Sequence, residues 1–85
     1  MSIRILYFAR LREDMGIAGE IFEPQAALSD VKSLRAQLIA RGGASAAAFA
    51  SGKAVRVSVN QDLGRDDTPV KAGDEVAFFP PVTGG

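Results

Sequence analysis

EVAFFPPVTGG, residues 75–85, is the stretch that decides how this chain folds. Its first five residues are mostly apolar, and Val76 and Phe78 recur at the period of two that is typical of a β-strand. Two prolines follow directly. Because proline has a fixed φ and no backbone donor, the strand must end before them. We therefore expect a strand over residues 75–79 and an extended tail over residues 80–85.

The tail is thin and stiff. Its six residues can span roughly 20 Å, at about 3.3–3.6 Å each, and the prolines favour a polyproline-like start. Gly84 and Gly85 have no side chains, so the tip can enter a narrow channel in another protein. We expect the carboxylate of Gly85 to be the functional group, carried by a domain formed from residues 1–79.

The composition limits the chemistry that this chain can perform by itself. Its 85 residues, 47% of them hydrophobic, suffice for one small domain with its own core. Cysteine and histidine are both absent. A thiol nucleophile, a thiolate metal site and the commonest general base are therefore missing, and we predict no metal site. A self-contained hydrolase, zinc enzyme or redox enzyme is disfavoured.

The charges are balanced, with ten basic and ten acidic residues and no cluster of Lys or Arg. Nucleic acid and anionic membranes are therefore disfavoured as partners. No apolar run approaches the length of a transmembrane helix, and the first residues lack the layout of a signal peptide. We expect a cytoplasmic protein.

Three more strands are predicted upstream of the last one. Alternation of side chains indicates strands over residues 3–9, 20–23 and 55–60, with a charged turn over residues 10–19. The polar loop that follows the third of these has room for a short edge strand near Leu63. The first two strands are expected to form an antiparallel hairpin.

One main amphipathic helix lies between the second and third strands. Ser29 is suited to be its N-cap, and Gly42 and Gly43 provide a stop. Residues 44–51 are rich in alanine and predict a short helical turn. The apolar stripe of the main helix consists of Val31, Leu34, Leu38 and Ile39.

This order of elements predicts an α+β domain in which one main helix packs on one face of a mixed sheet. The first and last strands are the most apolar, which suits adjacent positions at the centre. The most economical arrangement is the β-grasp fold of ubiquitin-like proteins. The obvious core residues are Ile3, Ile5, Tyr7, Val55, Val57, Val59, Val76 and Phe78.

A helix can cover only one face of this sheet, so the other face is left with apolar side chains. Leu6 and Phe8 on the first strand and Ala77 and Phe79 on the last are expected there, and Leu63 could extend the patch. We interpret this apolar face as a docking surface beside the tail. The alternative is that loops partly cover these side chains.

The final glycines also have a plain explanation as a flexible end. The preceding prolines and the missing Cys and His favour a functional tail. A carboxylate needs activation before it can transfer its acyl group. An enzyme that uses ATP can convert it to an acyl-adenylate, which a sulfur or amine nucleophile then attacks.

Several motifs resemble the small subunit of molybdopterin synthase, the MoaD-type sulfur carrier. They are ILYFA at 5–9, LRE at 11–13, VSVNQ at 57–61 and GDEVAFFPPVTGG at 73–85. The resemblance covers essentially the whole chain, and its ending is specific. It implies the ubiquitin-like β-grasp fold and the role of a non-catalytic, sulfur-donating subunit.

The resemblance also implies a reaction. An ATP-dependent adenylating enzyme activates Gly85, and a sulfur donor converts it to a thiocarboxylate. The chain then docks on the large catalytic subunit in a heterotetramer. There it gives sulfur to cyclic pyranopterin monophosphate, which builds the dithiolene of molybdopterin. The chain itself binds no cofactor, and the ATP is used by the activating partner.

By position, Phe8 and Phe79 match the apolar contact residues of that family, and Arg12 matches a further contact. The tail that enters the partner consists of Pro80, Pro81, Val82, Thr83, Gly84 and Gly85. Three alternatives remain open. They are a sulfur carrier of another pathway, such as thiazole synthesis, a protein modifier joined to lysines, and a binding module with an incidental diglycine.

Overall fold

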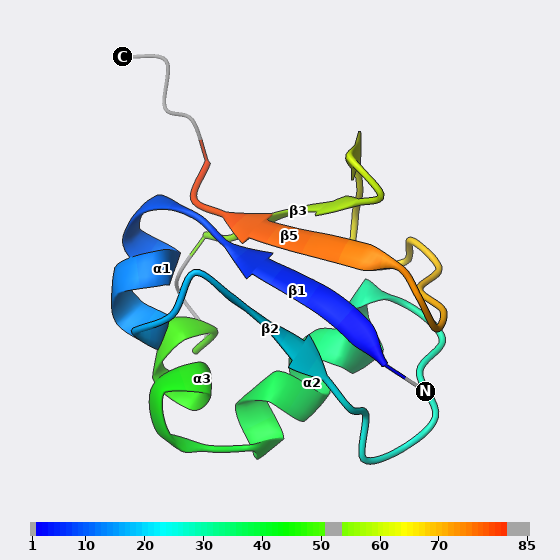
Figure 1. Ribbon diagram of the computed structural model, residues 1–85, viewed down its shortest axis with the longest axis horizontal. Coiled ribbons are helices and arrows are strands. Elements are labelled where there is room, and N and C mark those ends of the chain that lie inside the picture. Colours follow the sequence, from blue (N-terminus) through cyan, green and yellow to red (C-terminus); the bar gives the residue numbers. More distant parts are fainter. Residues whose placement is uncertain (1, 51–53, 82–85) are drawn as a thin grey trace.

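The computed structural model describes residues 2–50 and 54–81. Five strands form one mixed sheet in the order β2-β1-β5-β3-β4 (Figure 1). The last strand in sequence, β5, is therefore the middle strand of the sheet. The strands are β1 (Ile3–Tyr7), β2 (Gly19–Phe22), β3 (Arg56–Val59), β4 (Asp62–Leu63) and β5 (Glu75–Phe79).

Three helices pack against this sheet: α1 (Ala9–Met15), α2 (Val31–Ala40) and α3 (Gly43–Ala48). In Figure 1, β2 passes in front of α2. Each helix sends at least one side chain into a single apolar core, such as Leu11 of α1, Leu34 of α2 and Ala48 of α3. The predicted α+β architecture, a mixed sheet with its main helix on one face, is confirmed.

The strand register separates the two faces of the sheet. β1 and β5 are parallel neighbours, with Ile5 beside Val76 and Tyr7 beside Phe78. β2 is antiparallel to β1, and β3 is antiparallel to β5. The predicted central pair of first and last strands is confirmed. The core residues alternate with those of the opposite face because successive side chains in a strand point in opposite directions.

The segment after β1 is a helix, so the predicted turn over residues 10–19 is wrong. α1 consists of ARLREDM, in which most residues favour a helix, and its Leu11 is fully buried. Gly16 ends α1 at a φ of 75°, a left-handed conformation that glycine adopts without strain. β1 consequently ends at Tyr7 instead of Ala9.

The start and the apolar stripe of α2 also need correction. Its N-cap is Asp30 and not Ser29. The Asp30 carboxylate accepts a hydrogen bond from the Ser33 backbone N–H at 2.8 Å, and the Ser33 hydroxyl oxygen accepts one from the Asp30 N–H at 3.1 Å. This reciprocal pair is a capping box. Ile39, predicted in the buried stripe, is 40% exposed.

The remaining connections follow the sequence pattern more closely. Gly42 and Gly43 both have positive φ. Gly42 lies between α2 and α3, and Gly43 is the first residue of α3, so the predicted helix stop is confirmed. The alanine-rich segment is helical over residues 44–48, as predicted, and Ser51 lies outside the described residues. Val55 precedes β3 and is only partly buried against the core, whereas the other seven predicted core residues are buried.

Candidate functional site

The tail starts from a firmly anchored point at the end of β5. The backbone N–H of Phe8 donates a hydrogen bond to the Phe78 carbonyl at 3.1 Å, which ties the start of α1 to this end. The ring of Phe78 is fully buried and packs edge to face on Phe49, with 4.8 Å between centroids. The last residues of β5 therefore have a rigid base.

The other end of β5 is held by a buried carboxylate. Asp74 is 6% exposed and accepts hydrogen bonds from the Asn60 amide at 3.0 Å and the Lys71 backbone N–H at 2.8 Å. The Asn60 side chain in turn accepts one from the Glu75 N–H at 3.0 Å. The bond from Asn60, with a smaller contribution from Lys71, lowers the pKa of Asp74. The carboxylate thus stays ionised and fixes where β5 begins.

The predicted docking residues lie on the face opposite the helices. The register forms a row across this open face, in which Leu6 of β1 lies beside Ala77 of β5, followed by Ser58 and then Leu63 of β4. Phe79 lies one step closer to the tail. Because Ser58 separates Ala77 from Leu63, the apolar patch does not run unbroken to β4.

Exposure differs widely among these residues. Leu63 is 70% exposed, whereas Leu6 and Phe79 are half-buried. Ala77 is on the open face, but only 8% of it is exposed, so its predicted exposure is wrong. Its short side chain lies between those of the neighbouring strands and is shielded by them. Contact of Ala77 with a partner remains a prediction.

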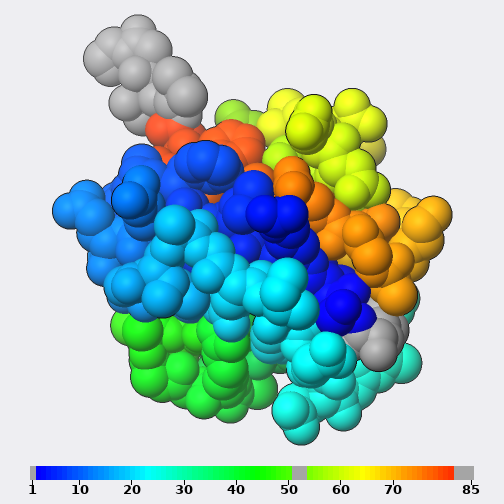
Figure 2. Space-filling view, viewed as in Figure 1, coloured from blue at the N-terminus to red at the C-terminus, as the bar shows by residue number. Residues whose placement is uncertain are grey.

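Phe8 reaches the open face's edge from a different element than predicted. It is the N-cap of α1 in an extended conformation, and it is 49% exposed. Figure 2 shows the first residues of α1, in blue, next to the end of β5, in orange-red. Arg12 is exposed one helical turn later. Phe8 and Phe79 therefore lie at the same end of the molecule.

The tail itself is described only in part. Pro80 and Pro81 are half-buried, follow β5 directly and belong to no helix or strand. The other predicted site residues of the tail, Val82, Thr83, Gly84 and Gly85, lie outside the described residues.

Sequence reasoning missed one part of the open face. Ile21 lies beside Arg4 in the register and is 64% exposed. Next to it, a shallow depression of about 370 Å³ is lined by residues that include Leu6 and Gly19. A Cβ at Gly19 would be 3.0 Å from Leu6 Cδ2 and 2.8 Å from the Ile5 carbonyl oxygen. The alternation in β2, with Phe22 in the core, was the signal that places Ile21 outside.

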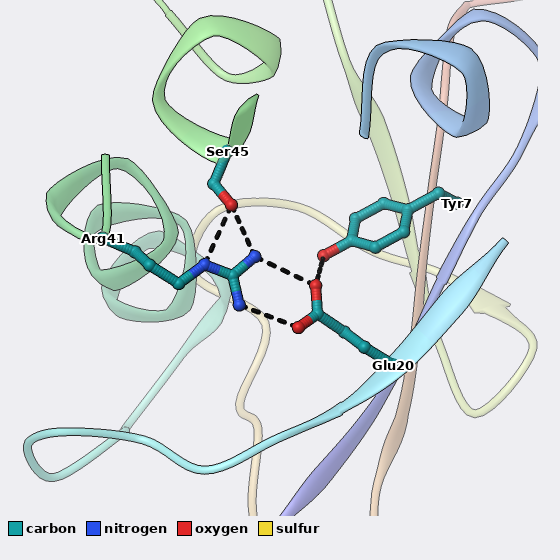
Figure 3. Close-up of polar contacts among 4 residues, drawn as sticks. All are labelled: Tyr7, Glu20, Arg41 and Ser45. Atoms are coloured by element: carbon teal, nitrogen blue, oxygen red, sulfur yellow. Dashed lines mark hydrogen bonds and ion pairs between the residues drawn. The ribbon is translucent and has the colours of Figure 1, made fainter. Parts of the chain in front are cut away.

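A polar network borders the core behind β1 and β2 (Figure 3). Glu20 accepts a hydrogen bond from the Tyr7 hydroxyl at 2.7 Å and forms a two-pronged ion pair with Arg41, at 2.7 and 2.9 Å. The Arg41 guanidinium also donates to Ser45, a buried residue of α3. The network therefore joins the sheet to α3 and the end of α2.

The network shifts the pKa values of Glu20 and Tyr7 in opposite directions. The hydrogen bonds from Arg41 lower the pKa of Glu20, with a smaller contribution from Tyr7, despite partial burial. Burial raises the pKa of Tyr7, and the neighbouring Glu20 adds to this shift. Glu20 is thus held as a carboxylate and Tyr7 as a neutral phenol. These shifts do not indicate a role in proton transfer, because Glu20 and Tyr7 are each hydrogen-bonded within the network.

Other candidate sites are sparse in the described part of the chain. A groove of about 420 Å³ runs between β2 and α2, lined by Phe22, Ala40 and others, and contains none of the predicted site residues. Within residues 2–50 and 54–81, no three His, Cys, Asp or Glu side chains gather as a metal site would require. No helix of these ranges has the length and apolar character to cross a membrane.

The mixed sheet, the helix-covered face and the open face define a ubiquitin-like β-grasp protein. The chain belongs to the ThiS family, which matches residues 5–85. It is 43% identical over 83 residues to the molybdopterin synthase sulfur carrier subunit of Escherichia coli, and the match covers 98% of this chain and 99% of the relative. The predicted resemblance is confirmed.

Solved structures agree on the fold. A putative molybdopterin converting factor subunit 1 from Pyrococcus furiosus superposes with a TM-score of 0.73 at 29% identity, covering 96% of this chain and 99% of the other. A complex of subunits 1 and 2 of molybdopterin-converting factor from Helicobacter pylori contains a chain that matches with a TM-score of 0.64 at 24% identity, with complete coverage of both chains. At that identity the likeness concerns the fold alone.

Proposed function

We propose that this chain is the sulfur-carrier subunit of a molybdopterin synthase and that Gly85 carries the sulfur. The observation behind this proposal is the full-length match to a sulfur carrier subunit at 43% identity. The family match over residues 5–85 includes the residues that form the central strand and the tail. The chain is then a sulfur-donating subunit and not a complete enzyme, in keeping with its lack of Cys and His.

The chemistry has two stages. The Gly85 carboxylate attacks the α-phosphate of ATP on an activating enzyme, which releases pyrophosphate and leaves an acyl-adenylate. A sulfur donor then displaces AMP, and the product is a thiocarboxylate. On the large catalytic subunit, the thiocarboxylate sulfur bonds to cyclic pyranopterin monophosphate. Water then cleaves the bond between this sulfur and the Gly85 acyl carbon, so Gly85 returns as a carboxylate and the sulfur stays on the pterin. A second carrier supplies the second sulfur of the molybdopterin dithiolene.

The fold suits this role because the strand that holds the tail in place, β5, is distinct from the tail that carries the sulfur. β5 is hydrogen-bonded on both sides, and Phe78 anchors its end in the core. A short tail that leaves from a rigid strand loses less orientational freedom when it enters a partner than one that leaves from a loose loop. Phe8, Phe79 and Leu6 supply apolar surface beside that exit.

The partners follow from the same proposal. The large subunit and the adenylating enzyme each dock on the open face, and two copies of each synthase subunit form a heterotetramer. The ATP belongs to the activating enzyme, and this chain binds no cofactor, nucleic acid or membrane. We place the reaction in the cytoplasm.

Intact mass spectrometry tests the central step. Incubation with the organism's adenylating enzyme, ATP and a sulfur source should raise the mass by about 16 Da, because one oxygen is exchanged for sulfur. A variant that lacks Gly85 is the matched control and should show no increase while keeping its fold. An unchanged mass for the complete chain would contradict the proposal, and conjugates with other proteins would favour a modifier.

A further inference from the structure

We propose that Arg56 is a specificity-determining residue of the open face, and that the large subunit places a carboxylate against it. This inference rests on the proposed function, because it concerns the partner that covers Phe79. The partner surface must then carry a negative charge as well as apolar side chains, although the other docking residues of this face are mainly apolar.

The register places Arg56 beside the point where the tail leaves. In the antiparallel pair of β3 and β5, Arg56 lies directly opposite Phe79, and Val57 lies opposite Phe78. Val57 and Phe78 are buried in the core, so Arg56 and Phe79 both point to the open face. Arg56 is exposed. A partner that covers the ring of Phe79 therefore also covers the guanidinium next to it.

No acidic strand residue of the described ranges lies beside Arg56 on this face. Among the described strand residues, the open face carries three charged side chains, which are Arg4, Glu75 and Arg56. Arg4 and Glu75 are neighbours in the register of β1 and β5, at the end of β5 that is farther from the tail. Among these strand residues, Arg56 is the charged one nearest to the tail, and neither of the other two lies beside it.

No ion pair within residues 2–50 and 54–81 occupies Arg56 either. The salt bridges of the described residues use Arg10, Arg35, Arg41 and Arg65, but not Arg56. By contrast, Arg41 is fully engaged with Glu20 and Ser45. The Arg56 side chain is therefore available to an acceptor from outside the domain.

The physical consequence concerns desolvation. A guanidinium that is removed from water without an acceptor is strongly unfavourable, whereas a carboxylate offers two parallel hydrogen bonds to it. A partner that buries Phe79 must therefore offer an acidic group beside its apolar patch, or lose affinity. Such a pair also steers the encounter and rejects surfaces that are apolar only.

Binding kinetics with the large subunit of molybdopterin synthase from the same organism test this inference. The variants are Arg56→Glu, Arg56→Lys and Arg56→Leu, and the matched control is Lys32→Glu, which makes the same charge change on an exposed residue of α2. Association and dissociation rates are measured at about 50 and 300 mM salt, where screening differs strongly. Thermal unfolding confirms that each variant is folded.

We expect Arg56→Glu to slow association about tenfold and to weaken affinity about 100-fold, because attraction becomes repulsion. Arg56→Lys should lose several-fold in affinity, since an ammonium cannot form the paired hydrogen bonds. The salt dependence of association should fall in Arg56→Glu, and Lys32→Glu should bind within about twofold of the unmodified chain.

Two results would overturn the inference. If the unmodified chain binds and Arg56→Glu binds equally well, no carboxylate faces this residue. If Arg56→Leu binds more tightly than the unmodified chain, the partner offers an apolar surface at this point. If the unmodified chain itself fails to bind the large subunit, the proposed function fails as well, which is a distinct outcome.

Discussion

Phe78 and Phe79 are identical neighbours with opposite surroundings. Phe78 is fully buried among rings of the core, which include Tyr7 and Phe49. Phe79 is half-buried on the open face, where no helix covers the sheet. The side chain is the same, so the difference comes from the face of β5 alone. One face of the sheet contributes stability, and the other remains available for a partner.

The second strand reverses the usual polarity of these two faces. Glu20 of β2 lies beside Ile5, on the helix-covered side, whereas Ile21 lies beside Arg4, on the open side. The charged residue is retained on the covered side because Arg41 and Tyr7 satisfy it. The apolar residue is 64% exposed, which extends the open face toward the sheet edge.

Truncation of Phe78 should have the largest effect. Phe78→Ala removes a fully buried ring at the centre of the aromatic cluster and leaves a cavity, so we expect a loss of about 3–5 kcal/mol in the free energy of unfolding. Urea unfolding followed by circular dichroism measures it. Phe78→Leu serves as the conservative control and should cost less. An unchanged midpoint in Phe78→Ala would contradict the assigned core.

Substitution of Phe79 should separate binding from stability. Phe79→Asp places a charge in the apolar patch, and we expect association with the large subunit to weaken by about 100-fold, or roughly 2.7 kcal/mol. The free energy of unfolding should change by about 1 kcal/mol or less, because the ring is only half-buried. If this variant unfolds the domain, the two faces have been assigned the wrong way round.

Neutralising Glu20 should have the smallest effect. Glu20→Gln removes the ion pair with Arg41 and weakens the bond from Tyr7, so we expect a loss of roughly 1–2 kcal/mol near neutral pH. Ile21→Ala is a matched control on the open side of the same strand and should cost less.

The effect of Glu20 should also depend on pH in a definite direction. Its pKa is lowered in the folded state, chiefly by hydrogen bonds from Arg41, relative to about 4.3 in the unfolded chain. The stabilisation is therefore complete above the unfolded pKa and disappears as the pH falls through the folded value. Unfolding curves at pH 7 and about pH 3 should show the gap between Glu20→Gln and the unmodified chain closing. If the difference in the free energy of unfolding grew in acid, the assigned ion pair of Glu20 with Arg41 would be wrong.

Local patterns predicted much of this structure. The alternation in β1, β3 and β5 identified the strands and assigned Phe78 and Phe79 to opposite faces, because the period of two is a property of the strand itself. The pair Gly42 and Gly43 identified the end of α2. The patterns missed α1 because its seven residues contain a single buried apolar residue, Leu11, too few for a helical period. The tail's chemistry was inferred from the motif, and its last four residues lie outside the described ranges.

The amino-acid sequence by itself determined the strand faces, the main helix, the proline-bounded tail and the lack of Cys and His. Only the tertiary structure decided which residues share a surface. The apolar character of the first and last strands predicted that β1 and β5 are neighbours, but only the fold supplied the register that brings residues about 70 positions apart into contact. The tertiary structure also placed Phe8 at the N-cap of α1 and shielded Ala77. It paired Arg41 with Glu20 and placed Arg56 opposite Phe79. Each of these outcomes depends on neighbours from other strands and helices, which the sequence lists far apart and the fold brings together.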